Sequence, residues 1–126
     1  MSHLTEVETI ISDLDILKRV LVEDDYEIIG SQTIYNAFDQ ASRPVDFIAQ
    51  AKNGFQVGFK HDAGGTYQVI ADWYGSGNTE EGFVGGISQK YSLIVAKKDL
   101  QDKGFRIVEE KNEADGSIRL LARRFE

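Results

Sequence analysis

The chain has 126 residues, which is enough for one domain with its own hydrophobic core. Hydrophobic residues make up 41% and charged residues 28%, a composition typical of globular proteins rather than disordered ones. The absence of cysteine excludes disulfides, thiolate metal sites and cysteine nucleophiles. A formal net charge of −7 disfavours nucleic acid as a partner, because such binding usually needs a basic face.

The same composition predicts a single domain over residues 1–126 without membrane insertion. No apolar run approaches the roughly 20 residues that a bilayer-spanning helix needs. The first eight residues, MSHLTEVE, lack the positive segment and apolar stretch of a secretory signal. We therefore expect a cytoplasmic or stromal protein.

The first third of the chain predicts a strand, a helix and a second strand. Residues 3–11 alternate loosely and contain β-branched side chains, so they predict an opening strand. Asp13 is placed to cap a short helix with leucines on one face, and a strand over 26–29 follows. Residues 30–44 show no clear period and contain the single proline. We expect a long loop there, with one helical turn around Tyr35 to Phe38.

The middle of the chain predicts a meander of strands over 45–51, 55–60 and 67–71. Asn53 and Gly54 are typical of a two-residue type I′ turn between the first two strands. A long helix is predicted over 79–103, with Asn78 and Glu81 as a capping box. Its inward stripe is expected to contain Phe83, Ile87, Tyr91 and Ile94.

A closing hairpin is predicted over 105–110 and 117–125, turning at Asp115 and Gly116. Strands outnumber helices and are joined mostly by tight turns. The sequence therefore predicts an α+β fold: an antiparallel sheet of about five to seven strands with two helices packed on one face.

Several short motifs, in their order and spacing, resemble the hypothetical chloroplast reading frame 35 family. This is a ycf-type group that is also described as domain of unknown function 1257. The motifs are Asn53-Gly54-Phe55, Gly58-Phe59, Ala71-Asp72-Trp73, Gln89-Lys90-Tyr91, Gly104-Phe105 and Asp115-Gly116-Ser117-Ile118-Arg119-Leu120. The resemblance covers nearly the whole chain and implies a role in cyanobacterial or plastid physiology, or in a phage of such a host.

The chain departs from the family pattern at some positions. Gln56 stands where the family often has aspartate, and Gly85 and Gly86 replace larger residues. Residues 92–94 lack the aromatic and histidine that commonly follow the family tyrosine. A histidine-dependent site on that helix would therefore be incomplete in this chain.

Two clusters of residues are candidates for binding a protein partner. Asp72, Trp73 and Tyr74 follow a predicted strand and enter a loop, where binding groups are often found. Tyr35 and Phe38 lie in the predicted loop over 30–44. Tryptophan and tyrosine are frequent in interface hot spots. The alternative interpretation is structural: Trp73 packs over the sheet edge, Asp72 caps the next turn, and the loop aromatics enter the core.

Other chemical sites find less support in the sequence. His61, Asp72 and Tyr91 would need to converge to form an acid–base pocket on the sheet face. Arg119, Arg123 and Arg124 form the one basic cluster, which a solvated terminal strand also explains. The glycine-rich segment 75–82 precedes a helix, but it has no lysine, and Glu80 and Glu81 would repel a phosphate.

The function that the sequence favours is a non-enzymatic protein-interaction or regulatory module. No convergent catalytic set is present, so the sequence predicts no cofactor and no metal site. The two alternatives are a small-molecule-binding or enzymatic domain with a pocket on the sheet face, and nucleic-acid binding through the C-terminal arginines.

Overall fold

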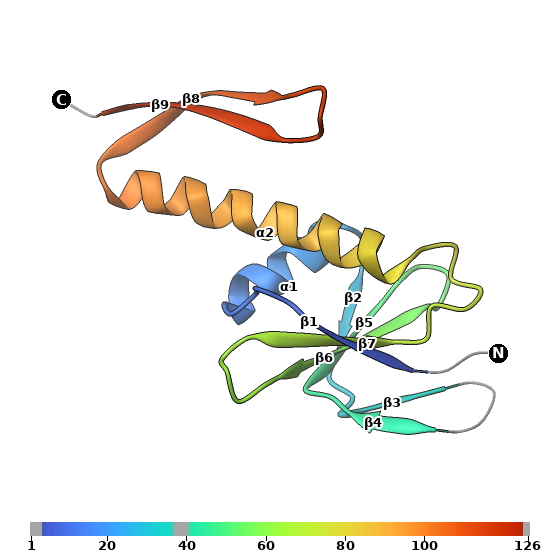
Figure 1. Ribbon diagram of the computed structural model, residues 1–126. Coiled ribbons are helices and arrows are strands. Elements are labelled where there is room, and N and C mark those ends of the chain that lie inside the picture. The colour runs from blue at the N-terminus through green and yellow to red at the C-terminus, as the bar shows by residue number, and fades with distance from the viewer. Residues whose placement is uncertain (1–3, 37–40, 125–126) are drawn as a thin grey trace. The chain divides into compact units, whose positions relative to one another are not determined.

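The computed structural model describes residues 4–36 and 41–124 (Figure 1). The elements in chain order are β1 (Thr5–Glu8), α1 (Leu14–Glu23), β2 (Glu27–Ile29), β3 (Thr33–Tyr35), β4 (Ser42–Pro44), β5 (Phe47–Gln50), β6 (Gln56–His61), β7 (Tyr67–Ala71), α2 (Glu80–Asp102), β8 (Phe105–Asn112) and β9 (Ile118–Arg124). All strand pairs are antiparallel, so the predicted α+β class is confirmed.

Contacts within the chain divide it into two compact units, residues 1–88 and residues 89–126. The first unit contains β1 to β7, α1 and the beginning of α2. The second contains the rest of α2 and the hairpin of β8 and β9. A single domain over residues 1–126 stays a prediction.

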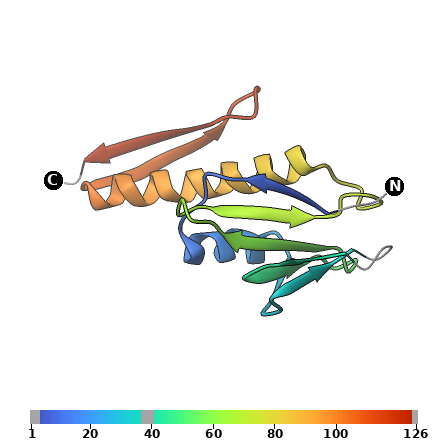
Figure 2. The same ribbon diagram turned by 60° about the horizontal axis from the view of Figure 1, so that its bottom comes forward.

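The first unit is built on a five-stranded sheet in the order β1-β7-β6-β5-β2. Figure 2 shows β1 and β7 side by side, as their register requires. On one face of this sheet the rings of Phe47 and Phe59 stack at 5.1 Å between centroids, and Tyr67 lies 6.3 Å from Phe47. This aromatic layer is the main core, because all three residues are buried.

Helix α1 covers this aromatic face and begins as the sequence predicts. The Asp13 carboxylate accepts a hydrogen bond from the backbone N–H of Ile16 at 3.1 Å, which satisfies one of the free donors at the helix start. Leu17 and Leu21 are fully buried, and the Lys18 ammonium lies 5.5 Å from the Phe47 ring centroid. The predicted cap and apolar face are therefore confirmed.

The expectation of a long loop over 30–44 is wrong. Residues 33–35 and 42–44 pair as a small second sheet, with Ile34 opposite Arg43. Tyr35 belongs to a strand, so no helical turn starts there. Residues 37–40, including Phe38, lie outside the described residues. Three-residue strands have too short a pattern to be recognised, and their pairing depends on burial against the main sheet.

The β3–β4 hairpin covers the second face of the main sheet, on the side opposite α1 (Figure 1). Ile34 and Val45 form a buried cluster with Ile48 and Ile70. Gly58 in the central strand makes this close approach possible. A Cβ atom on Gly58 would lie 2.6 Å from Val45 Cγ1 and 3.4 Å from Ile34 Cγ2. Strand β6 is therefore buried on both sides at this point.

The predicted type I′ turn at Asn53-Gly54 is wrong in type, though right in position. Only Gly54 has positive φ, at 89°, and the Gly54 N–H donates to the carbonyl of Ala51 at 2.9 Å. This is a three-residue loop, a type I turn followed by a left-handed glycine. The hairpins that turn at Gly65 and Gly116 have the same geometry, with φ of 90° and 89°.

Helix α2 begins with a different cap from the one predicted. The Thr79 hydroxyl accepts from the N–H of Gly82 at 3.0 Å, so Thr79 is the N-cap residue. Asn78 lies one position earlier and accepts from the N–H of Thr79 at 2.8 Å. The predicted capping box of Asn78 and Glu81 is therefore wrong. Phe83, Ile87 and Tyr91 of the predicted stripe are buried, whereas Ile94 is half-exposed.

In the second unit β8 and β9 pair only with each other, as a two-stranded ribbon. The Gln89 side chain of α2 donates to the carbonyl of Gly116 at 2.5 Å, and Lys97 forms an ion pair with Glu110. An open groove of about 410 Å³ lies between the helix and the ribbon. Its lining includes Leu93, Ala96, Ile118 and Leu120.

Candidate functional site

A hollow of about 250 Å³ lies on the second face of the main sheet, beside β3. It is lined by Leu4, Ile34, Tyr35, Gly54, Phe55, Gln56, Asp72 and Tyr74. Three of the five residues predicted to bind a partner, Tyr35, Asp72 and Tyr74, are in this set. Two segments almost 40 positions apart in the sequence therefore meet at one surface depression.

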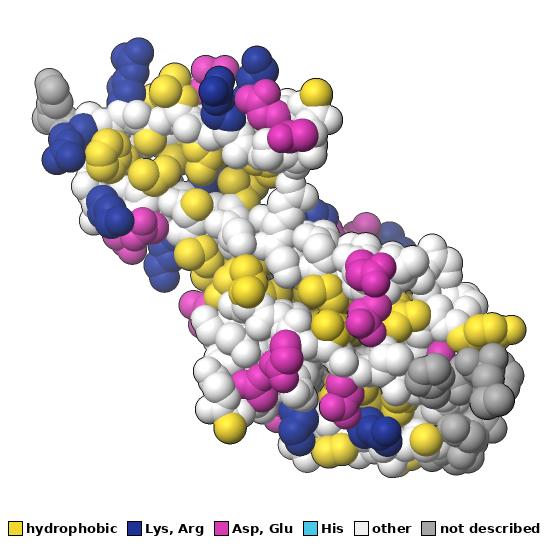
Figure 3. Space-filling model, in the orientation of Figure 1, with side chains coloured by type: hydrophobic (Ala, Val, Ile, Leu, Met, Phe, Trp, Pro, Cys, Tyr) yellow, Lys and Arg dark blue, Asp and Glu magenta, His cyan; other side chains and the backbone are white. Residues whose placement is uncertain are grey.

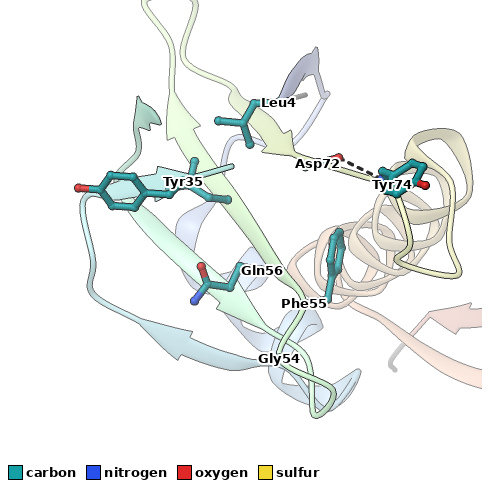
Figure 4. A pocket seen from close by; sticks show the side chains of 8 residues that line it. Leu4, Tyr35, Gly54, Phe55, Gln56, Asp72 and Tyr74 are labelled. Atoms are coloured by element: carbon teal, nitrogen blue, oxygen red, sulfur yellow. Dashed lines mark hydrogen bonds between the residues drawn. The ribbon is translucent and has the colours of Figure 1, made fainter. Parts of the chain in front are cut away.

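The two tyrosines are the most exposed part of this site. Tyr35 is 62% exposed and Tyr74 is 66% exposed. Figure 4 shows their side chains on opposite sides of the hollow, with Gln56 and Leu4 between them. Large aromatic side chains with this much exposure favour contact with another molecule. Binding would remove their apolar surface from water, which lowers the free energy of the complex.

Asp72 is held in a fixed position at the end of β7. Its Oδ1 atom accepts a hydrogen bond from the backbone N–H of Tyr74 at 3.1 Å, closing a short turn (Figure 4). The predicted turn-capping interpretation of Asp72 is therefore confirmed. The same turn directs Tyr74 to the rim of the hollow. Among the described residues, no lysine or arginine lines the hollow.

Trp73 supports the site from behind and does not line it. Its ring lies 5.5 Å from that of Phe55 and 5.5 Å from that of Phe83, between centroids. The side chain is half-buried, and its indole N–H is buried with no hydrogen-bond acceptor. This packing matches the structural interpretation of Trp73. Phe38, the fifth predicted residue, lies outside the described residues.

The sequence did not single out Leu4, Ile34 and Gln56 as parts of this site. Gln56 and Asp72 point to the same face of the sheet as Gly58 and Ile70, because alternate residues of a strand share a face. The Gln56 amide donates to the Gln50 side chain at 2.9 Å, which fixes its orientation. Strand alternation could have placed Gln56 here, but only the β3–β4 hairpin creates the depression.

The alternative acid–base pocket does not assemble. His61 pairs with Tyr67 at the start of β7, whereas Asp72 follows Ala71 at its end. Five residues of extended chain separate those positions by about 17 Å, far beyond hydrogen-bond reach. The His61 ring instead lies 4.9 Å from the Tyr67 ring. Among the described residues, no group of three His, Asp or Glu side chains could hold a metal ion.

The groups whose pKa is clearly displaced belong to the core and the turns. Burial raises the pKa of Tyr26, and nearby Asp24 adds to the effect. Burial also raises the pKa of Tyr67, with contributions from Asp46 and Asp13. Hydrogen bonds from the Ser117 hydroxyl and N–H lower the pKa of Asp115. These shifts are explained by packing and turn formation.

The sequence matches the family described as "Protein of unknown function (DUF1257)" over residues 20–121. It is also 34% identical over 128 aligned positions to "Uncharacterized protein ycf35" of Cyanophora paradoxa, covering 99% of this chain and 98% of that protein. The chain belongs to this family. Proteins with the same description from Pyropia yezoensis and Guillardia theta are each 27% identical over the same coverage.

The family membership confirms the predicted resemblance, while a phage origin finds no support in these matches. The descriptions of the family and of these relatives name no reaction and no partner. No solved structure matches the chain. Neither helix in the described part of the chain combines enough length with enough apolar sequence to span a bilayer.

Proposed function

We propose that this chain is a non-enzymatic interaction module that docks a protein partner at the hollow beside β3. The observation that supports it most is the convergence of Tyr35 and Tyr74 around one depression, both largely exposed. Interface hot spots are enriched in tyrosine, and they lie where a side chain of the partner can fill a pocket. Asp72 would add an acceptor for a donor on the partner.

The packing around Tyr74 supports the proposal that this surface is preorganised before binding. Trp73 packs between Phe55 and Phe83, and the Asp72 turn fixes the chain that carries Tyr74. A preorganised surface loses little conformational entropy when a partner docks. Rigid aromatic groups at the rim therefore fit recognition of a folded or extended protein segment.

A small-molecule site at the same hollow is the weaker candidate. The volume of about 250 Å³ falls below the roughly 300–1,000 Å³ of most ligand pockets. Among the described residues that line it, Asp72 is the one carboxylic acid and there is no histidine. Acid–base chemistry usually needs a second such group within hydrogen-bond reach.

The setting we propose is a cyanobacterial cytoplasm or a plastid stroma. The support is the family membership and the ycf35 relatives of Cyanophora paradoxa, Pyropia yezoensis and Guillardia theta. The partner would then be a protein of that compartment.

Site-specific photo-crosslinking tests the docking surface. A photoreactive phenylalanine at position 74 or 35, expressed in the native type of host, should give one crosslinked protein of defined mass at both positions. Position 22 is the matched control, because Val22 is an exposed hydrophobic residue of α1, 57% exposed and away from the hollow. The same pattern of products at all three positions would contradict the proposal.

Substitution of the tyrosines gives an independent measurement. Tyr35→Ala with Tyr74→Ala should abolish capture of that crosslinked protein while leaving the fold intact, since both side chains are mostly exposed. Val22→Ala should leave capture unchanged. Trp73→Ala is a poor test, because loss of its packing on Phe55 and Phe83 would destabilise the unit.

A further inference from the structure

Charge is distributed very unevenly between the two units. Residues 1–88 carry 14 acidic and five basic side chains, a formal net charge of −9. Residues 89–126 carry seven acidic and nine basic side chains, a formal net charge of +2. The total charge of −7 is therefore the sum of a strongly acidic first unit and a weakly basic second unit, so it does not exclude an anionic partner for the second.

The register of the ribbon gathers the basic residues on one face. Arg106 lies directly opposite Arg123, and Lys111 lies directly opposite Arg119. Directly opposite residues in an antiparallel pair project from the same face. Like charges in that position repel each other and destabilise the pairing. The Glu113 carboxylate, 3.8 Å from the Arg119 guanidinium, offsets part of this repulsion in one of the two pairs.

The opposite face of the ribbon is already in use. Ile118 and Leu120 line the groove toward α2, and Glu110 pairs with Lys97. The basic face is exposed: Leu121 between the cation pairs is 48% exposed, and the Arg119 side chain is 76% exposed. Figure 3 shows Lys and Arg side chains over β8 and β9. The acids beside these cations are Glu109, opposite Leu121, and Glu113, whose carboxylate lies 3.8 Å from the Arg119 guanidinium.

The spacing of the cation pairs matches duplex DNA. Arg119 and Arg123 are four residues apart on β9, which corresponds to about 14 Å along the strand. The major groove of B-DNA is about 12 Å wide and admits a two-stranded β-ribbon. We propose that the outward face of β8 and β9 binds duplex DNA, with the pairs Arg106–Arg123 and Lys111–Arg119 contacting phosphates on the two sides of the groove.

The chemistry of the face favours phosphate over an acidic protein surface. Three of the four cations are arginines, whose planar guanidinium matches phosphate oxygens in a bidentate geometry. Protein interfaces usually have aromatic residues at their centre. Among the described residues of this face there is none. Phe105 lies opposite Arg124 in the register, and the Arg124 guanidinium lies 4.9 Å from the Phe105 ring centroid on the other side of the ribbon.

The acidic unit does not prevent such binding at cellular salt. Exposed charges are largely screened beyond about 8 Å at physiological ionic strength. The local set of four cations and the two carboxylates of Glu109 and Glu113 therefore dominates at the ribbon. The affinity should be modest and strongly dependent on salt.

Fluorescence anisotropy with a labelled 20-base-pair DNA duplex, in 50–200 mM KCl, tests the proposal on the full chain. We expect binding at 50 mM KCl that weakens steeply as salt rises. Arg119→Gln with Arg123→Gln should lower affinity at least tenfold. The slope of log K against log salt should fall by about 1.8, because each lost phosphate contact removes about 0.9.

Lys52→Gln with Lys98→Gln is the matched control, since both lysines are exposed and neither belongs to β8 or β9. This variant changes net charge equally and should change affinity less than threefold. Far-UV circular dichroism and Trp73 fluorescence should be unchanged in both variants. No binding at 50 mM KCl, or equal losses in the two variants, would overturn the proposal.

Competition by two other polyanions shows whether the ribbon is selective for duplex DNA. An RNA duplex of the same sequence should bind more weakly, because its major groove is too deep and narrow for a ribbon. Polyglutamate should compete poorly. RNA binding as tight as that of DNA would overturn the groove geometry, and strong competition by polyglutamate would point to an acidic protein surface instead.

Discussion

The two units of this chain differ in how they are held together. In residues 1–88 a five-stranded sheet has both faces covered, and 17 buried hydrophobic residues form its core. Among the described residues from 89 onward, Tyr91 is the one buried hydrophobic residue. Two-stranded hairpins are marginal in water, because they bury little apolar surface for the entropy they lose. The first unit therefore has its own core. The described contacts that hold the second unit together are mainly polar ones between α2 and the ribbon, such as the Gln89–Gly116 hydrogen bond and the Lys97–Glu110 ion pair.

This contrast also separates the two proposed surfaces. The hollow lies on the five-stranded sheet of the first unit and presents aromatic side chains. The ribbon is open on one side and presents cations. The two proposals can therefore fail independently: the crosslinking test concerns residues of the first unit, and the DNA test concerns residues of the second.

The largest expected effect comes from the aromatic core of the first unit. Phe59 is fully buried and stacks on Phe47, so Phe59→Ala should cost about 3–5 kcal/mol of unfolding free energy. Leu120→Ala in the second unit removes a half-exposed side chain and should cost less than about 1.5 kcal/mol. Urea unfolding followed by Trp73 fluorescence and by far-UV circular dichroism measures both. Equal costs would show that the second unit has a comparable core.

A smaller loss of unfolding free energy is expected when the packing between the β3–β4 hairpin and the main sheet is disturbed at Gly58. Gly58→Ala places a methyl group 2.6 Å from Val45 Cγ1, which should destabilise the first unit by about 1–3 kcal/mol. Gly86→Ala is the matched control, because no atom lies within 4 Å of the added Cβ. It should stabilise α2 by up to about 1 kcal/mol. If Gly58→Ala is neutral in urea unfolding, the β3–β4 hairpin does not pack as described.

The smallest effect concerns the turn of the ribbon. Hydrogen bonds from Ser117 hold the pKa of Asp115 below its ordinary value of 3.8. The folded state then binds fewer protons than the unfolded chain near pH 4, so the stabilisation is full above the ordinary pKa. It is lost as the pH falls through the lowered folded-state pKa. Carbon-13 NMR titration of the Asp115 carboxyl measures this.

Ser117→Ala is the test variant for that turn. It removes the hydroxyl donor and keeps the backbone donor, so the pKa of Asp115 should rise part of the way toward its ordinary value. An unchanged pKa would show that the hydroxyl bond does not form in solution.

Local signals in the sequence predicted much of the fold. Asp13 caps α1, β7 spans Tyr67–Ala71 as expected, and the three glycine turns occur where they were predicted. Each depends on a cap, an alternation or a glycine within a few residues. The candidate residues Tyr35, Asp72 and Tyr74 were also found from composition and position. Their shared hollow was not predictable, because it depends on a hairpin of three-residue strands.

The sequence alone determined the α+β class, the family and the approximate positions of most elements, since propensity, capping and hydrophobic period are local properties of the chain. The tertiary structure decided which segments lie opposite one another. It placed the β3–β4 hairpin on the second sheet face, Trp73 behind Tyr74, and Arg106 opposite Arg123. Those relations depend on packing and register between segments distant in sequence, which no local pattern specifies.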